Sequence, residues 1–140
     1  MDNFKIHSYL FETTKRLAVN KSLDAAMLRS KANAMNISNV DVPGYNRKEV
    51  AFEEMLRKCL NRKVDGVQTD DKHIEISKKA AMRKLAPEVY VPVDPAQASG
   101  ANNVDIDIEN AKMAENQILY NYGIKFSSFE KLKSSITSRH

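Results

Sequence analysis

Two long stretches of the chain carry apolar residues at steps of three and four, the spacing that lines up along one side of an α-helix. The first stretch runs from about residue 6 to residue 37, and neither proline nor glycine interrupts it. A helix of about thirty residues would be about 45 Å long. The pattern therefore predicts a long amphipathic N-terminal helix. Its apolar or small positions are Ile6, Leu10, Thr13, Leu17, Leu23, Met27, Ala34 and Ile37.

The second periodic stretch begins near Asn103 and ends near Ile136. Acidic residues gather at its start and basic residues near its end, which is the arrangement that the helix dipole favours. Gly123 interrupts it at a cost of about 1 kcal/mol relative to alanine. The pattern predicts a second long helix. Its stripe consists of Ile108, Ala111, Ile118, Tyr122, Phe129 and Ile136, widened by Met113, Leu119, Phe126 and Leu132.

The segment between these helices, residues 40–103, is irregular, since it holds all four prolines and three of the four glycines. Apolar positions in residues 52–60 predict a short amphipathic helix. Alternating valines in residues 89–93 predict a short extended strand, and Pro92 places that strand at a sheet edge or leaves it unpaired. Residues 94–103 are rich in turn-forming residues.

These patterns predict a mainly α fold in which the N- and C-terminal helices pair antiparallel in a coiled-coil manner around an irregular insert. The three segments, residues 1–39, 40–103 and 104–140, together form one domain. Aromatic residues make up only 7% of the chain and tryptophan is absent. One helix pair would shield only part of each stripe, so neighbouring copies or related subunits are expected to cover the rest. The expected assembly residues are Leu10, Leu17, Met27, Ile37, Ile108, Ala111, Ile118, Tyr122, Phe129 and Ile136.

Residues 36–45, with the sequence NISNVDVPGY, predict a sharp reversal of the chain after the first helix. Asn39 can adopt the left-handed conformation that closes a helix. Pro43 and Gly44 suit the central positions of a type II turn. On physical grounds alone, the segment is a well-formed turn and nothing more.

Charge and cysteine content narrow the class of protein. Residues 1–63 hold 12 Lys and Arg against 7 Asp and Glu, and a solvated helix face explains this excess better than a binding site for nucleic acid or anionic lipid. Cys59 is the only cysteine, so an internal disulfide is impossible. No apolar run approaches the ~20 residues of a membrane span. Residues 1–5 lack the start of a cleavable signal peptide, so any export is expected to bypass the general secretory pathway.

Catalytic, metal and cofactor sites are not expected. The three histidines lie far apart, without zinc-site spacing. Asp105, Asp107 and Glu109 resemble the start of a calcium loop, but the required glycine and glutamate do not follow. Cys59 lacks a nucleophile signature, and no glycine-rich phosphate loop is present. The chain is therefore not predicted to be an enzyme.

The turn segment resembles the signature of flagellar rod and hook proteins, Asn-Ile-Ala-Asn-x-x-Thr-Pro-Gly-Tyr, which follows their N-terminal helix. Ser38 replaces the usual alanine and Val42 replaces the usual threonine. The matching residues are Asn36, Ile37, Asn39, Pro43, Gly44 and Tyr45.

A second resemblance narrows the family. Residues 102–107 and 111–117, followed by Tyr120, resemble the C-terminal pattern of proximal rod proteins of the FlgB type. Thr69 and the pair His73-Ile74 resemble a short central motif of the same family. Together the matches cover both ends, about half of the chain.

The resemblance implies a structural rod subunit that polymerises through its terminal helices and helps to transmit torque from the motor to the hook and filament. It implies export without a cleavable signal peptide and assembly in the periplasmic basal body. The implied partners are copies of the chain itself, other rod proteins, the rod-to-ring adaptor protein and the export gate. No cofactor, nucleic acid or direct membrane span is expected.

Two other hypotheses stay open from the sequence. A helical export chaperone or adaptor could use the same stripes to bind a flagellar or type III secretion partner. A basic nucleic-acid binder ranks last, because the chain lacks aromatic platforms and a recognisable motif for reading bases.

Overall fold

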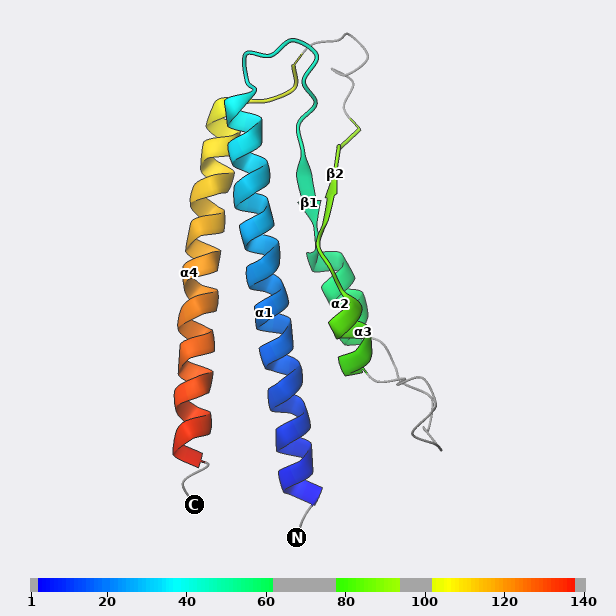
Figure 1. The fold of residues 1–140 in the computed structure, drawn as a ribbon, viewed down its shortest axis with the longest axis vertical. Helices are drawn as coiled ribbons and strands as arrows, with labels where there is room; N and C mark the ends of the chain where they lie inside the picture. The colour runs from blue at the N-terminus through cyan, green and yellow to red at the C-terminus, as the bar shows by residue number, and fades with distance from the viewer. Residues whose placement is uncertain (1–2, 62–77, 94–101, 138–140) are drawn as a thin grey trace.

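The computed structural model describes residues 3–61, 78–93 and 102–137, and two long helices dominate it (Figure 1). The helices run antiparallel and side by side, so both chain ends lie at the same end of the molecule. The predicted mainly α fold is confirmed. The elements in chain order are α1 (Asn3–Ser38), β1 (Glu49–Ala51), α2 (Glu53–Asn61), α3 (Lys78–Lys84), β2 (Glu88–Tyr90) and α4 (Ile106–Thr137).

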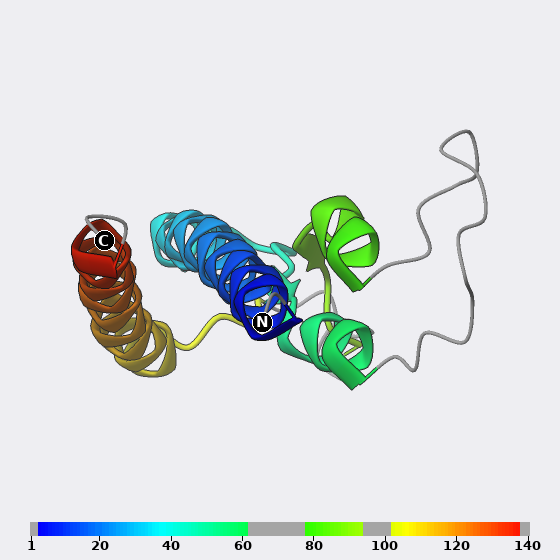
Figure 2. The same ribbon diagram turned by 90° about the horizontal axis from the view of Figure 1, so that it is seen from below.

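The insert lies on the side of α1 opposite to α4, so that α1 is the middle layer (Figure 2). β1 and β2 form an antiparallel pair in which Val50 lies opposite Val89. The predicted short helix is confirmed as α2. The predicted strand at residues 89–93 is confirmed only in its first part, because β2 ends at Tyr90, before Pro92. Helix α3 was not predicted, because Met82 is its one large apolar residue; that side chain is fully buried. Thr69, His73, Ile74 and residues 94–101 lie outside the described residues.

The core is small and lies mainly between α1 and the insert. In the described ranges, its buried apolar residues are Ala25, Ala26, Ala32, Phe52, Cys59 and Met82. Three of these are alanines on α1, which bring the neighbouring elements close to the helix but bury little apolar area each. A core of this size gives the isolated fold limited hydrophobic stabilisation.

Helices α1 and α4 meet through small and polar residues. The Asn116 side chain on α4 donates a hydrogen bond of 2.8 Å to the carbonyl oxygen of Ala26. A Cβ added at Gly123 would lie 2.8 Å from Cδ2 of Leu23, so this glycine permits close contact between the helices. Gly123 is therefore a packing position as well as a weak point in helix propensity.

Pairing with α1 shields only a small part of the predicted α4 stripe, in which Met113 is half-buried. Ile118, Tyr122 and Phe129 are 57%, 69% and 62% exposed. The physical reason is that polar side chains need partners when two helices approach closely, and α1 supplies them. The face carrying Glu109, Asn116 and Gly123 therefore turns toward α1, and the apolar face turns away.

The turn after α1 has the predicted geometry at its centre. Gly44 has φ of 73°, and the amide of Tyr45 donates to the carbonyl of Val42 at 3.2 Å. The predicted left-handed Asn39 is wrong, since every described residue with positive φ is a glycine. The Asn39 side chain instead donates to the carbonyl of Met35 at 2.7 Å, and this bond satisfies a carbonyl in the last turn of α1.

Gly44→Val is expected to lower the free energy of unfolding by about 1–2 kcal/mol, because a side chain is strained in the left-handed region. Gly44→Asn should lose less, since asparagine tolerates that region. Urea denaturation followed by circular dichroism measures both. Equal losses in the two variants would contradict the backbone explanation.

Candidate functional site

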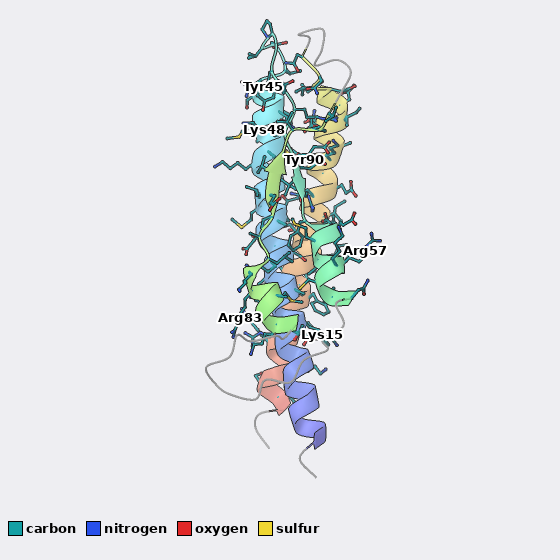
Figure 3. The ribbon with its side chains drawn as sticks, turned by 90° about the vertical axis from the view of Figure 1, so that its right-hand side faces the viewer. Lys15, Tyr45, Lys48, Arg57, Arg83 and Tyr90 are labelled. Carbon is teal, nitrogen blue, oxygen red and sulfur yellow. The ribbon has the colours of Figure 1, made fainter. Side chains whose placement is uncertain are left out.

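The buried side chain of Asn36 joins the end of α1 to three other parts of the chain. Its amide nitrogen donates to the carbonyl of Lys48 at 2.9 Å and to Oε2 of Glu109 at 2.9 Å. Its oxygen accepts from the Lys48 amide at 2.9 Å and from the Tyr45 hydroxyl at 3.1 Å. An asparagine side chain offers two donors and two acceptor lone pairs, so its hydrogen-bonding capacity is filled. Figure 3 shows Tyr45 and Lys48 at the end of the molecule away from the termini.

Asn102 provides a second connection to the end of α1. Its side-chain nitrogen lies 2.7–2.9 Å from the carbonyl oxygens of Asn39, Val40 and Val42. Its oxygen accepts from the amide of Val104 at 2.8 Å. Asn39 and Val42 also accept backbone hydrogen bonds within the turn, so Asn102 adds a side-chain donor to carbonyls that follow the end of α1 and ties α4 to that turn.

Asn103 and Asp105 complete the approach to α4. The Asn103 oxygen accepts from the Arg47 amide at 2.8 Å. The Asp105 carboxylate accepts from the amides of Asp107 and Ile108 at 2.9 and 3.2 Å, as an N-cap residue does. The two sequence motifs, about sixty residues apart, therefore form one hydrogen-bonded unit, which we call the helix-end network; it comprises Asn36, Tyr45, Arg47, Lys48, Asn102, Asn103, Asp105 and Glu109.

Glu49 on β1 connects the insert to α4. It pairs with the Lys112 ammonium at 2.8 Å and accepts from the Tyr90 hydroxyl at 3.0 Å. The hydrogen bond from Lys112 is the main reason that the pKa of Glu49 is lowered. The hydrogen bond to Glu49 in turn raises the pKa of Tyr90. Burial, followed by the nearby charge of Glu109, raises the pKa of Tyr45.

The structure places the predicted motif residues in different roles. Asn36 and Tyr45 make side-chain hydrogen bonds in the network, and Pro43 and Gly44 form the turn. Asn39 supplies a backbone carbonyl, and Ile37 is half-buried. Sequence reasoning missed Glu49 and Lys112, because only the fold brings these oppositely charged residues together. It placed Glu109 at a helix start without foreseeing that the carboxylate would be buried.

The predicted assembly residues lie mostly on exposed faces. Leu10 lies in α1, Leu17 and Ile37 are half-buried, and Met27 is exposed. All six of the α4 positions are exposed on the face away from α1; they are Ile108, Ala111, Ile118, Tyr122, Phe129 and Ile136. The site is therefore a polar junction that fixes two helices, together with an apolar face that this junction leaves open.

The described residues were also compared with the requirements of a metal site, a membrane span and a ligand-binding groove. Among them, His, Cys, Asp and Glu form no group of three that could hold a metal ion. None of the helices there combines the length and apolar character that crossing a membrane requires. A groove of about 400 Å³ lies between α1, β1, α2 and α4. Four of its charged residues form two ion pairs, Arg29 with Glu53 and Lys112 with Glu49.

Asn36→Leu is expected to lower the free energy of unfolding by about 3 kcal/mol or more, because it leaves Lys48, Tyr45 and Glu109 without buried partners. Ser38→Ala is the matched control on the same helix turn. Its exposed hydroxyl bonds only the carbonyl of Ala34, so its effect should stay under about 0.5 kcal/mol. Similar urea midpoints for the two variants would argue against a central role for Asn36.

The stability of the chain should depend on pH through Glu49. Because folding lowers its pKa, ionised Glu49 stabilises the fold fully above its ordinary pKa of 4.5. This contribution is lost as the pH falls below 4.5 through the lower pKa of the folded state. Glu49→Gln should therefore be less stable than wild type at neutral pH, and the difference should disappear in acid. A constant difference across a pH series of urea titrations would refute the assignment.

Comparison with known proteins connects this architecture to a family. No family model matches the chain. The chain is 32% identical over 115 residues to the flagellar basal body rod protein FlgB of Borrelia hermsii, an alignment that covers 79% of this chain and 84% of the relative.

Two further relatives carry the same description. The FlgB protein of Bacillus subtilis (strain 168) is 28% identical over 121 residues, covering 85% of this chain and 90% of the relative. That of Escherichia coli (strain K12) is 26% identical over 106 residues, covering 71% and 75%. These alignments extend well beyond the helix-end network that joins the two motifs. The motifs and the 32% identity over 79% of the chain agree, and the chain belongs to the FlgB family of flagellar basal body rod proteins.

Proposed function

We propose that this chain is a structural subunit of the flagellar rod that polymerises through its terminal helices and helps to transmit torque from the motor to the hook and filament. The observation that carries the proposal is the apolar face of α4, which the fold leaves exposed along nearly the whole helix. Large exposed apolar patches mark interaction surfaces, because leaving them in water is unfavourable. A rod provides neighbouring helices that cover them.

The shape of the molecule suits a load-bearing polymer. Two antiparallel helices of 36 and 32 residues form a stiff unit. The helix-end network fixes them at one end through buried hydrogen bonds, so that twisting one helix moves the other. Torsional load would be shared over many helix contacts between subunits.

The insert has a different place in the proposed rod. Residues 6–37 and 104–136 would form the inner part of the tube, and residues 46–100 would face outward. The layered arrangement in Figure 2 supports this, since α2 and α3 lie to one side of the long helices. A structure of the assembled rod that places β2 at the lumen would contradict it.

The proposed location and partners follow from the rod family. The chain would be exported without a cleavable signal peptide and assembled in the periplasmic basal body. Its neighbours would be copies of itself, other rod proteins, the rod-to-ring adaptor protein and the export gate. A structural subunit needs no catalytic site, and the proposal includes none.

Deleting the gene should remove flagella and swimming, and the chain should be a component of purified basal bodies. A motile deletion strain would overturn the proposal. The presence of the chain in basal bodies also separates a rod subunit from an export chaperone, which the finished rod would lack.

Removing residues 125–140 should also abolish rod assembly, and with it flagella and swimming.

Phe129→Ser tests the apolar face directly. It should reduce swimming strongly, because the variant loses the apolar contact that Phe129 would make with a neighbouring subunit. Phe129 is 62% exposed in the single chain, so the stability of the monomer should change little. Ser128→Ala, at the adjacent exposed position, should swim normally. Swimming in soft agar and electron microscopy of basal bodies measure both variants, and normal motility of Phe129→Ser would contradict this role for the face.

A further inference from the structure

The groove of about 400 Å³ between α1, β1, α2 and α4 is lined by charged, amide and apolar side chains. One of its walls is a single stripe of α4, because residues 112, 115, 116 and 119 take the i, i+3, i+4 and i+7 positions of one helix face. The other walls come from α1 and the insert. A side chain that enters the groove would therefore contact four elements of the fold. The lining residues outside α4 are Arg29, Asn33, Glu49, Val50 and Glu53.

The groove holds more carboxylates than cations. Arg29 pairs with Glu53. Lys112 pairs with Glu49 at 2.8 Å. The fifth charged residue, Glu115, is exposed and forms no hydrogen bond or ion pair with any residue that the structure describes. Three carboxylates therefore stand against two cations, and the remaining negative charge favours the approach of a positively charged group.

Two buried asparagine side chains in the groove have hydrogen-bonding capacity left over. Asn33 is 8% exposed, and within the described ranges its side chain makes no hydrogen bond. Asn116 is 6% exposed, and its nitrogen donates to the carbonyl of Ala26, but its oxygen is buried without a partner in those ranges. Buried amides normally have partners, because an unpaired polar group costs free energy. These two side chains indicate that the groove receives a hydrogen-bond donor from outside the chain.

A lysine side chain matches these features better than other groups. Its ammonium carries a positive charge and three donors, and the groove offers acceptors on Asn33, Glu115 and Asn116. Its aliphatic stem can lie against apolar surface, which Val50 and Leu119 supply. The planar fork of arginine suits two oxygens of one carboxylate, whereas the acceptors here belong to three different residues. An acidic or apolar group would leave the Glu115 charge without a partner.

We propose that the groove is a docking site for a lysine side chain of a neighbouring rod subunit, with its ammonium on Glu115 and its stem on Leu119. The inference rests on the proposed function, because the neighbour is part of the rod, and it adds a polar contact to the apolar one. Apolar helix faces can pack in several registers, whereas a charge pair enclosed between subunits is satisfied in one. The lysine would therefore fix the position of the neighbouring subunit along α4.

Carbodiimide cross-linking of purified basal bodies tests the contact in the assembled rod. The reagent joins a carboxylate to an amine that touches it, so mass spectrometry should find Glu115 linked to a lysine of another subunit. Lys112 lines the same groove, so a link between Glu115 and Lys112 counts as internal. Basal bodies that carry Glu115→Gln are the control; they should lose the link at this position and keep the other cross-links of the rod.

A charge exchange tests whether the contact matters for assembly. Glu115→Lys should reduce the swimming diameter in soft agar at least about twofold, because it sets two ammonium groups against each other. Replacing the cross-linked lysine of the neighbour with glutamate should restore swimming in that strain, which a purely structural role for Glu115 would not allow. Glu88→Lys is the matched control and should swim normally, since Glu88 is an exposed carboxylate on β2 outside the groove. Immunoblotting checks that all the strains contain equal amounts of the chain.

Three results would overturn the inference: a Glu115 that forms no link outside its own chain, a Glu115→Lys strain that swims normally, or a defect that the charge exchange does not relieve. Each of them can be observed while the chain is present in basal bodies, so each leaves the rod proposal standing. Basal bodies that lack the chain altogether would refute the rod proposal and this inference together.

Discussion

The four hydrogen bonds of Asn36 hold together segments that the chain separates widely. Through one buried side chain, the end of α1 contacts the turn at Tyr45, the backbone at Lys48 and the carboxylate of Glu109 on α4. A buried amide tolerates few alternative arrangements, because each unpaired group would cost free energy. The position of α4 against α1 therefore depends on polar complementarity at one end, and apolar packing adds comparatively little there.

The contact between α1 and α4 determines which face of α4 stays exposed and can bind other chains. Gly123 and Asn116 lie at the boundary between the long helices, and most of the large apolar side chains of α4 stay in solvent. An ordinary helical pair would bury those side chains to gain stability. Here the exposed face is available for contacts with other chains, and the isolated fold keeps only a small core. Weak internal packing and a strong capacity for association have the same structural cause.

The insert contributes through charge as well as packing. Glu49 on β1 pairs with Lys112 on α4, so the two-stranded sheet is tied to the helix on the far side of α1. Tyr90 on β2 bonds the same carboxylate and extends the connection to the second strand. The insert therefore braces both long helices near the end where the helix-end network lies, and the opposite end carries the chain termini.

The sequence by itself determined the long helices, the turn at Pro43–Gly44, the short helix α2, the strand β2 and the family. Helical periodicity, proline and glycine placement and local motifs depend on neighbouring residues, so they can be read along the chain. Only the tertiary structure decided which face of α4 meets α1, that Glu109 is buried, and that Glu49 pairs with Lys112. Those outcomes depend on how closely small residues let two helices approach and on which polar groups then find partners across the fold. An apolar stripe predicts a contact surface, but the competing demand of polar groups for buried partners decides whether that contact lies inside the chain or between chains.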